Sequence, residues 1–178
     1  MNVLDLAQRR HSPRAFSGQA LAWEDLVPAF EAARLSSSSY NNQPWRFMVG
    51  LKGEAGFDAL LDTAVEANRS WMKDAGAIVG VVSSGVLEKT GEPDHAAMYG
   101  VGMAVNAMEF TFVAQGLTSM QAGGFDRKAF GELAGLPYHH TPIALLAVGH
   151  APEGHTPSPK VRKDLDDIVF KVGDRIPG

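Results

Sequence analysis

The sequence lacks cysteine entirely among its 178 residues. This absence excludes disulfide bonds, thiolate metal sites, iron–sulfur clusters and a cysteine nucleophile at once. A chain without cysteine is compatible with a reducing compartment, and we expect a cytoplasmic protein.

A surplus of positive charge and a long uninterrupted apolar run are also missing. The formal net charge is −4 and the pI is near 5.8, which argues against nucleic acid or an anionic membrane as a partner. The most hydrophobic stretch, residues 96–114, is interrupted by Asn106, Glu109 and Thr111. A bilayer span needs roughly 20 predominantly apolar residues, so we expect a buried helix here. The first ten residues lack the apolar core of a secretion signal.

The order of apolar and polar residues predicts one domain over residues 1–178, without internal repeats. Helices are expected over 1–9, 23–35, 54–68, 95–115 and 127–134, and strands over 46–51, 77–84, 117–122 and 143–150. The run 77–84 is apolar on both faces, as in a central strand. From residue 151 onward, four prolines and the lack of an apolar run predict an extended tail.

The expected helix 95–115 is apolar on all sides. Met98, Val101 and Val105 recur at helical spacing, while Met103 and Phe110 occupy the opposite side. A helix of this kind has to be covered on every face. One domain can do this alone, but a second copy of the chain covers one face equally naturally, and we favour a homodimer.

Two basic clusters stand far apart in the sequence. Four potential cations and a hydroxyl lie within Arg9, Arg10, His11, Ser12 and Arg14. Arginine offers several donors to phosphate, and serine adds one more. Such a cluster also occurs as a solvated basic helix end, which complements the helix dipole.

The second cluster is the pair Lys160 and Arg162, on the expected tail. Two cations one residue apart on an extended segment point to the same side. They can close over an anion, or they can be an exposed, solvated tail.

Two polar segments also suit a planar ligand. Residues 41–46 (NNQPWR) carry side-chain amides that can pair with the edge of a heteroaromatic ring, although an ordinary turn before a core tryptophan has the same composition. Gly123 and Gly124 would let backbone N–H groups approach a ring closely. The alternative is a strand-to-helix turn in which Asp126 caps the next helix.

Three other signals predict no site. Gly100 and Gly102 imitate the start of a dinucleotide fingerprint, but they lie inside a helix and follow no strand. His139 and His140 have no third ligand at metal spacing, so no metal is expected. Ser83 and Ser84 close an expected strand, but they are not part of a Gly-x-Ser-x-Gly elbow, so no serine nucleophile is expected.

In their order along nearly the whole chain, these segments resemble the nitroreductase family of FMN-dependent oxidoreductases. The resemblance rests on residues 10–16 (RHSPRAF), 38–47 (SSYNNQPWRF), Asn68 with Asp74–Ala75, 123–126 (GGFD) and 159–162 (PKVR). It implies an α+β three-layer sandwich in which helices wrap a mostly antiparallel sheet. It also implies a homodimer with one FMN at each of two subunit boundaries.

The resemblance further implies roles for individual residues. Those expected at the flavin phosphate are Arg10, Ser12, Lys160 and Arg162, with Arg14 beside the ribityl chain and the N1/O2 edge. Asn68 is expected at the pyrimidine edge, and the backbone of Gly123 and Gly124 near N5. The loop with Ser38, Ser39 and Asn41 is expected to come from the partner subunit, and the cofactor-binding set is completed by His11 and Gln43. No protein nucleophile or acid–base pair is needed, because the flavin carries the redox chemistry.

The function that this resemblance implies is two-electron transfer from NADH or NADPH to a nitroaromatic, a quinone or a similar small acceptor by a ping-pong mechanism. Two departures qualify it. Trp71 stands where some relatives carry a lysine. The segment between Ser84 and the long helix is short, which predicts a substrate pocket that is open or differently covered. Two alternatives therefore remain: a variant flavin chemistry, such as dehalogenation or heterocycle oxidation, and a non-catalytic protein that binds or sequesters flavin.

Overall fold

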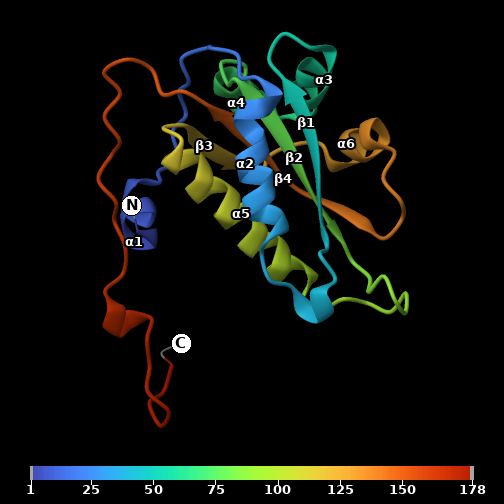
Figure 1. Ribbon diagram of the computed structural model, residues 1–178, viewed down its shortest axis with the longest axis vertical. Coiled ribbons are helices and arrows are strands. Elements are labelled where there is room, and N and C mark those ends of the chain that lie inside the picture. Colours follow the sequence, from blue (N-terminus) through green and yellow to red (C-terminus); the bar gives the residue numbers. More distant parts are fainter. Residues whose placement is uncertain (1, 177–178) are drawn as a thin grey trace.

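The computed structural model describes residues 2–176, which form an α+β sandwich around one four-stranded sheet (Figure 1). All three strand pairs are antiparallel, in the order β1-β2-β4-β3. The strands are β1 (Trp45–Leu51), β2 (Ala77–Ser84), β3 (Thr118–Ala122) and β4 (His140–Gly149). The α-helices are α1 (Val3–Arg9), α2 (Trp23–Arg34), α3 (Ala55–Thr63), α4 (Glu66–Met72), α5 (Ala97–Ala114) and α6 (Arg127–Ala134), with 3-10 turns η1 (Ser39–Asn41) and η2 (Leu165–Asp167).

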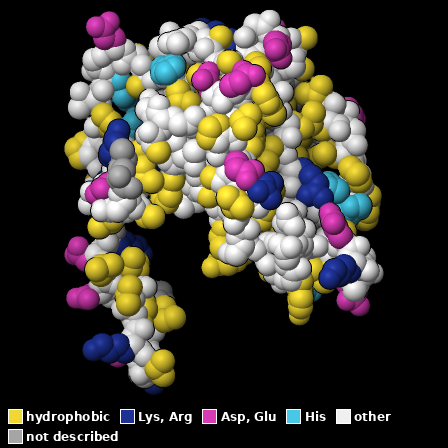
Figure 2. Space-filling view, in the orientation of Figure 1, with side chains coloured by type: hydrophobic (Ala, Val, Ile, Leu, Met, Phe, Trp, Pro, Cys, Tyr) yellow, Lys and Arg dark blue, Asp and Glu magenta, His cyan; other side chains and the backbone are white. Residues whose placement is uncertain are grey.

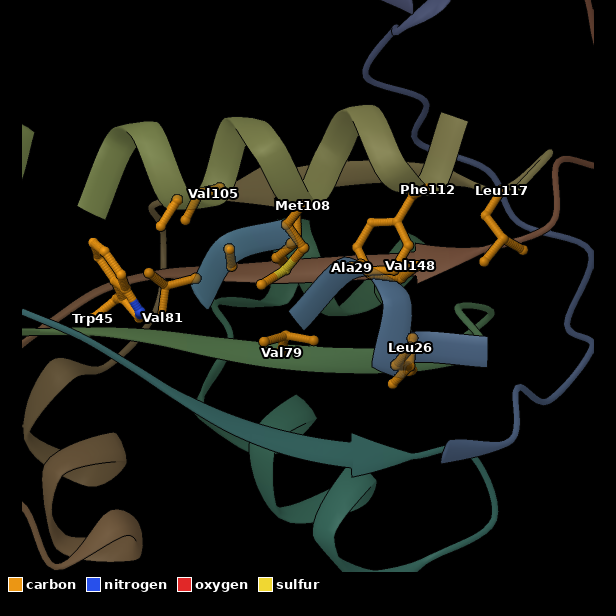
Figure 3. Close-up of a cluster of buried hydrophobic side chains, with 14 of the residues drawn as sticks. Leu26, Ala29, Trp45, Val79, Val81, Val105, Met108, Phe112, Leu117 and Val148 are labelled. Atoms are coloured by element: carbon orange, nitrogen blue, oxygen red, sulfur yellow. The ribbon is translucent and has the colours of Figure 1, made fainter. Parts of the chain in front are cut away.

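Helices cover both faces of the sheet, which confirms the three-layer arrangement. Every residue of β2 is buried, and successive side chains alternate between two cores. Val79 and Val81 face the core beneath α2 and α5, where Met108 and Phe112 point toward the strands (Figure 3). Ile78 faces the second core, which α3, α4 and α6 close.

The long helix α5 is fully covered on only one side within a single chain. Met108 and Phe112 are completely buried, whereas Met98 and Tyr99 are exposed, the latter at 74%. Complete burial by the chain itself, one of the two arrangements expected for this apolar helix, is therefore not observed.

The single helix expected over 54–68 is wrong: the structure has two helices, α3 and α4, separated by Ala64 and Val65. Both of these residues adopt extended backbone angles. Ala64 forms a β-bridge with Phe125, and the Val65 N–H donates to the Gly124 carbonyl at 3.1 Å. This pairing with a segment about 60 residues later has no local sequence signal, and it places α4 against the Gly123–Gly124 turn.

The last strand begins earlier than expected, at His140 instead of Ile143. The added residues include Pro142, which has no backbone N–H to donate to a ladder. The register between β2 and β4 shifts between Val81 and Val82, which pair with Ala144 and Pro142. This irregularity lets the strand continue through the proline.

The C-terminal segment, residues 151–176, is extended as predicted, apart from the turn η2. It runs beside α1 and then leaves the body of the molecule (Figure 1). Its far part projects apolar side chains into solvent (Figure 2), namely Leu165, Ile168, Val169, Val172 and Ile176.

Candidate functional site

The two basic clusters, about 150 residues apart in the sequence, line one cavity of about 430 Å³. We call this cavity the basic pocket. Four cations line it: Arg10, Arg14, Lys160 and Arg162. Its other lining residues are His11, Ser12, Pro13, His155, Ser158, Pro159 and Val161.

The first wall of the basic pocket, residues 10–14, follows directly from the end of α1. This short helix starts with a reciprocal cap between Asn2 and Asp5, and its backbone turns extended at Arg10. Pro13 and Phe16 are buried, and the Ser17 N–H donates to the His150 carbonyl at 2.9 Å. The first wall thus continues α1 at its start, and the hydrogen bond of Ser17 joins the chain just after it to the body of the protein.

Arg10 is oriented by two neighbours. Its Nη1 donates to Ser12 Oγ at 3.1 Å and lies 3.8 Å from Glu109 Oε1. Burial raises the pKa of the Glu109 carboxyl, and the charge of Arg10 lowers it in part. In the sequence, Glu109 was only an interruption of an apolar helix, and its role beside Arg10 was missed.

The second wall of the basic pocket is the segment 155–162. Lys160 Nζ donates to the Ala7 carbonyl of α1, and the ring of His155 stacks on that of His11 with centroids 5.6 Å apart. The pKa of Lys160 is lowered by desolvation and then by the charges of Arg10 and Arg162. A bound anion would relieve this like-charge repulsion. His155 was also missed, because a single histidine on a polar tail carries no distinctive signal.

A second group of predicted residues lies where α4 meets the turn after β3. Asn68 Nδ2 donates to the Gly124 carbonyl at 2.9 Å. A Cβ added at Gly124 would lie 2.8 Å from Asn68 Nδ2, so a side chain there would displace the Asn68 amide. A Cβ added at Gly123 would have nothing within 4 Å, so the fold of the chain does not itself require that glycine.

The predicted residues Ser38, Ser39, Asn41 and Gln43 lie near the other end of α5. A Cβ at Gly100, in the first turn of α5, would contact Ser38 and Pro44, whereas Glu109 beside the basic pocket lies two and a half turns further on. That separation is roughly 14 Å along the helix axis. The single chain therefore does not bring this loop into the basic pocket.

The loop 38–43 is strained and internally bonded. Tyr40, Asn41 and Gln43 all have positive φ. The Gln43 N–H donates to Ser38 Oγ at 3.0 Å, and Gln43 Nε2 donates to the Asn41 carbonyl at 3.2 Å. Asn42 ties the loop to the short segment after β2, since its Nδ2 donates to Asp94 Oδ2 at 2.8 Å. This strain is typical of functional loops.

The structure also shows where Trp71 and the two adjacent histidines lie, and whether any helix could cross a membrane. Trp71 is buried and stacks on Phe16. The rings of His139 and His140 contact each other at a tilt, with centroids 4.5 Å apart. Within residues 2–176, no group of three or more acidic or histidine side chains could hold a metal ion. None of the helices described is both long and apolar enough to cross a bilayer.

Comparison with known proteins gives a consistent result. The family model described as "Nitroreductase family" matches residues 7–70 and 52–150. The chain is 25% identical, over 95% of its length and 98% of the relative's, to a Streptococcus pyogenes protein named "Putative NAD(P)H nitroreductase". A solved structure of an oxidoreductase containing FMN superposes with a TM-score of 0.88 at 25% identity and covers all of this chain and 94% of that one. A nitroreductase family protein of Streptococcus pneumoniae superposes with a TM-score of 0.80 at 20% identity, over 96% of this chain and 100% of that one.

Proposed function

The chain belongs to the nitroreductase family, and from that premise we propose that it binds FMN and passes two electrons from NADH or NADPH to a small acceptor such as a nitroaromatic or a quinone. The observation that carries this proposal is the convergence of both basic clusters on one pocket. The S. pyogenes relative is named for NAD(P)H, and the solved oxidoreductase contains FMN.

The basic pocket suits the FMN phosphate. Arg10 and Arg162 offer planar, multi-donor recognition, Lys160 adds a point charge, and Ser12 adds a hydroxyl. Desolvation lowers the pKa of Lys160, and the positive charges of Arg10 and Arg162 lower it further, so these three cations repel one another without a ligand. A phosphate with a charge near −2 at neutral pH would neutralise them.

The flavin ring would extend from the basic pocket toward Asn68 and the Gly123–Gly124 turn. The amide of Asn68 would pair with the pyrimidine edge, and its bond to Gly124 keeps the turn in place. The backbone N–H of Gly123 would face N5, and Arg14 would offset negative charge near N1 and O2. FMN supplies the redox chemistry itself by accepting a hydride and passing on the electrons.

The proposed assembly is a homodimer with FMN at the subunit interface. Ser38, Ser39, Asn41 and Gln43 of a second copy would complete each site, which is consistent with their distance from the basic pocket of their own chain. The exposed Met98 and Tyr99 on α5 and the apolar residues of the C-terminal segment would be covered by the same contact. Light scattering on the purified protein should give twice the chain mass, and a monomer would contradict the shared site.

Turnover is proposed to be ping-pong: the nicotinamide donor and the acceptor would occupy the same open space in turn. The decisive test is an anaerobic mixture of the FMN-loaded protein with NADH and, separately, with NADPH, followed by flavin absorbance. Rapid bleaching with either donor is expected, and the faster one identifies the preferred donor. Tight FMN binding without bleaching would instead indicate a non-catalytic flavin-binding protein. A colourless protein that FMN does not stabilise against heat would contradict the whole proposal.

A further inference from the structure

The proposed function leaves one buried ionisable side chain without a role. Glu109 lies near the middle of α5, and the residue is only 5% exposed. A carboxylate at such a position is costly to bury unless it is paired and hydrogen-bonded, so its neighbours indicate what it is for.

The neighbours of Glu109 comprise two neutral donors and one cation. From β3, Ser119 Oγ donates to Oε1 at 3.2 Å and Gln121 Nε2 donates to Oε2 at 3.1 Å. Neither group titrates. Arg10 is the one charged group for which the described residues show a contact with Glu109, at 3.8 Å. The pKa of Glu109 therefore depends mainly on burial, which raises it, and on the charge of Arg10, which lowers it.

Arg10 thus stands between a buried carboxylate and the basic pocket. The 3.8 Å separation from Glu109 is too long for a hydrogen bond, so the two groups interact as charges. The same Nη1 donates to Ser12 Oγ at the pocket wall, and a guanidinium carries five N–H donors in all. A phosphate in the pocket would therefore share Arg10 with Glu109.

We propose that Glu109 is a positioning residue which, through Arg10, couples FMN phosphate binding to the uptake of one proton. This inference rests on the proposed function, in that the basic pocket takes the FMN phosphate. When Glu109 is ionised, it offsets the charge of Arg10 and repels the incoming phosphate. When it takes a proton from solvent, the full charge of Arg10 faces the ligand.

The direction of the pH effect follows from the geometry. Burial already disfavours the ionised carboxylate, which raises its pKa, and a phosphate on the far side of Arg10 disfavours it further. The repulsion between two negative charges on either side of one guanidinium should change the Kd by about tenfold after solvent screening. Lowering the pH should remove this repulsion.

The test compares the full-length wild type with Glu109→Gln by titrating each with FMN and following flavin fluorescence from pH 5 to pH 8.5. Glutamine keeps the shape and can still bond Ser119 and Gln121, but it carries no charge. The matched control is Glu31→Gln, the same change in an exposed ion pair with Arg34. Riboflavin, which lacks the phosphate, is titrated in parallel.

The measured quantity is the ratio of the wild-type Kd to the Glu109→Gln Kd at each pH. For FMN we expect about 10 at the highest pH, where Glu109 is ionised, and a decline as the pH falls and Glu109 takes its proton, with a constant ratio near 1 for riboflavin and for the control. His11 and His155 also line the pocket and titrate in both proteins, so their direct contributions cancel in the ratio. The FMN phosphate loses one of its two charges near pH 6, which by itself lowers the ratio. The ratio is therefore also measured with the sulfate ester of riboflavin, whose single charge is constant over this range, and its decline with falling pH is assigned to Glu109.

Two outcomes would overturn the coupling: a ratio for the sulfate ester that does not vary with pH, or the same variation for riboflavin. A glutamate that only supports the fold would give the first result. Failure of the wild type to bind FMN at any pH would instead contradict the proposed function and is distinguishable from both.

Discussion

The two walls of the basic pocket are built in different ways. The first wall, residues 10–14, is continuous with α1, is followed by the buried Phe16, and has Arg10 beside the buried Glu109. The second wall, residues 155–162, is almost entirely exposed, and within the described residues one lysine hydrogen bond and one ring stack join it to α1 and the first wall.

This difference indicates how the proposed phosphate site is organised. A donor that is fixed before the ligand arrives loses little conformational entropy on binding, whereas an exposed side chain on an extended segment loses more. The first wall should therefore contribute more affinity than the second, although both carry two cations.

Arg10→Ala should have the largest effect, because it removes an oriented, charge-assisted donor. We expect FMN affinity to fall by about 100-fold at pH 7, the size typical for hydrogen bonds to charged groups. Fluorescence titration measures it, and Lys128→Ala, an exposed cation on α6, is the matched control. Unchanged affinity would remove Arg10 from the site.

Arg162→Ala should have a smaller effect, about tenfold, because this side chain is exposed and bonded only to the carbonyl of its neighbour Val161 among the described contacts. The same titration tests it. A loss larger than that of Arg10→Ala would reverse the ranking of the two walls. Full FMN retention in both variants would mean that no phosphate site exists here.

Loosening the second wall without removing a charge should have a still smaller effect. Replacing Pro157 and Pro159 by glycine increases the freedom of the unbound segment, and each change should weaken FMN binding about twofold to fivefold. Isothermal calorimetry should show the loss as a less favourable entropy. An unchanged Kd would show that the segment is ordered by other contacts.

The smallest expected effect concerns the stability of the protein, through Glu109, which lies behind the first wall. The folded-state pKa of Glu109 is raised, so the folded state holds more protons than the unfolded state between the ordinary glutamate pKa and that raised value. Wild-type stability then falls as the pH rises through this window.

Glu109→Gln lacks that penalty. Its free energy of unfolding should exceed that of the wild type by on the order of 1 kcal/mol at pH 8 and match it near pH 4. Urea unfolding of the FMN-free protein measures both values. Lys160→Ala, in the exposed second wall, should leave the unfolding free energy unchanged at either pH, and a loss there would show that the second wall supports the fold.

Most of the secondary structure could be predicted from the sequence. The apolar run 77–84 is β2 with the expected bounds, because a strand buried on both faces needs no periodicity to be visible. The Gly135 that follows α6 and the Asp126 that caps it are likewise local signals. The two basic clusters could also be identified from the sequence, because the positive charge of an arginine or lysine does not depend on where the fold places it.

Only the tertiary structure decided which of these pieces meet. The break between α3 and α4 depends on Gly124 and Phe125, and the continuation of β4 through Pro142 depends on the register with β2. The basic helix end and the basic tail each fitted a solvated surface on their own. Their meeting in one pocket, with Glu109 behind Arg10, depends on contacts between residues about 100 to 150 positions apart. Such contacts form because packing buries distant segments together, and no local pattern records them.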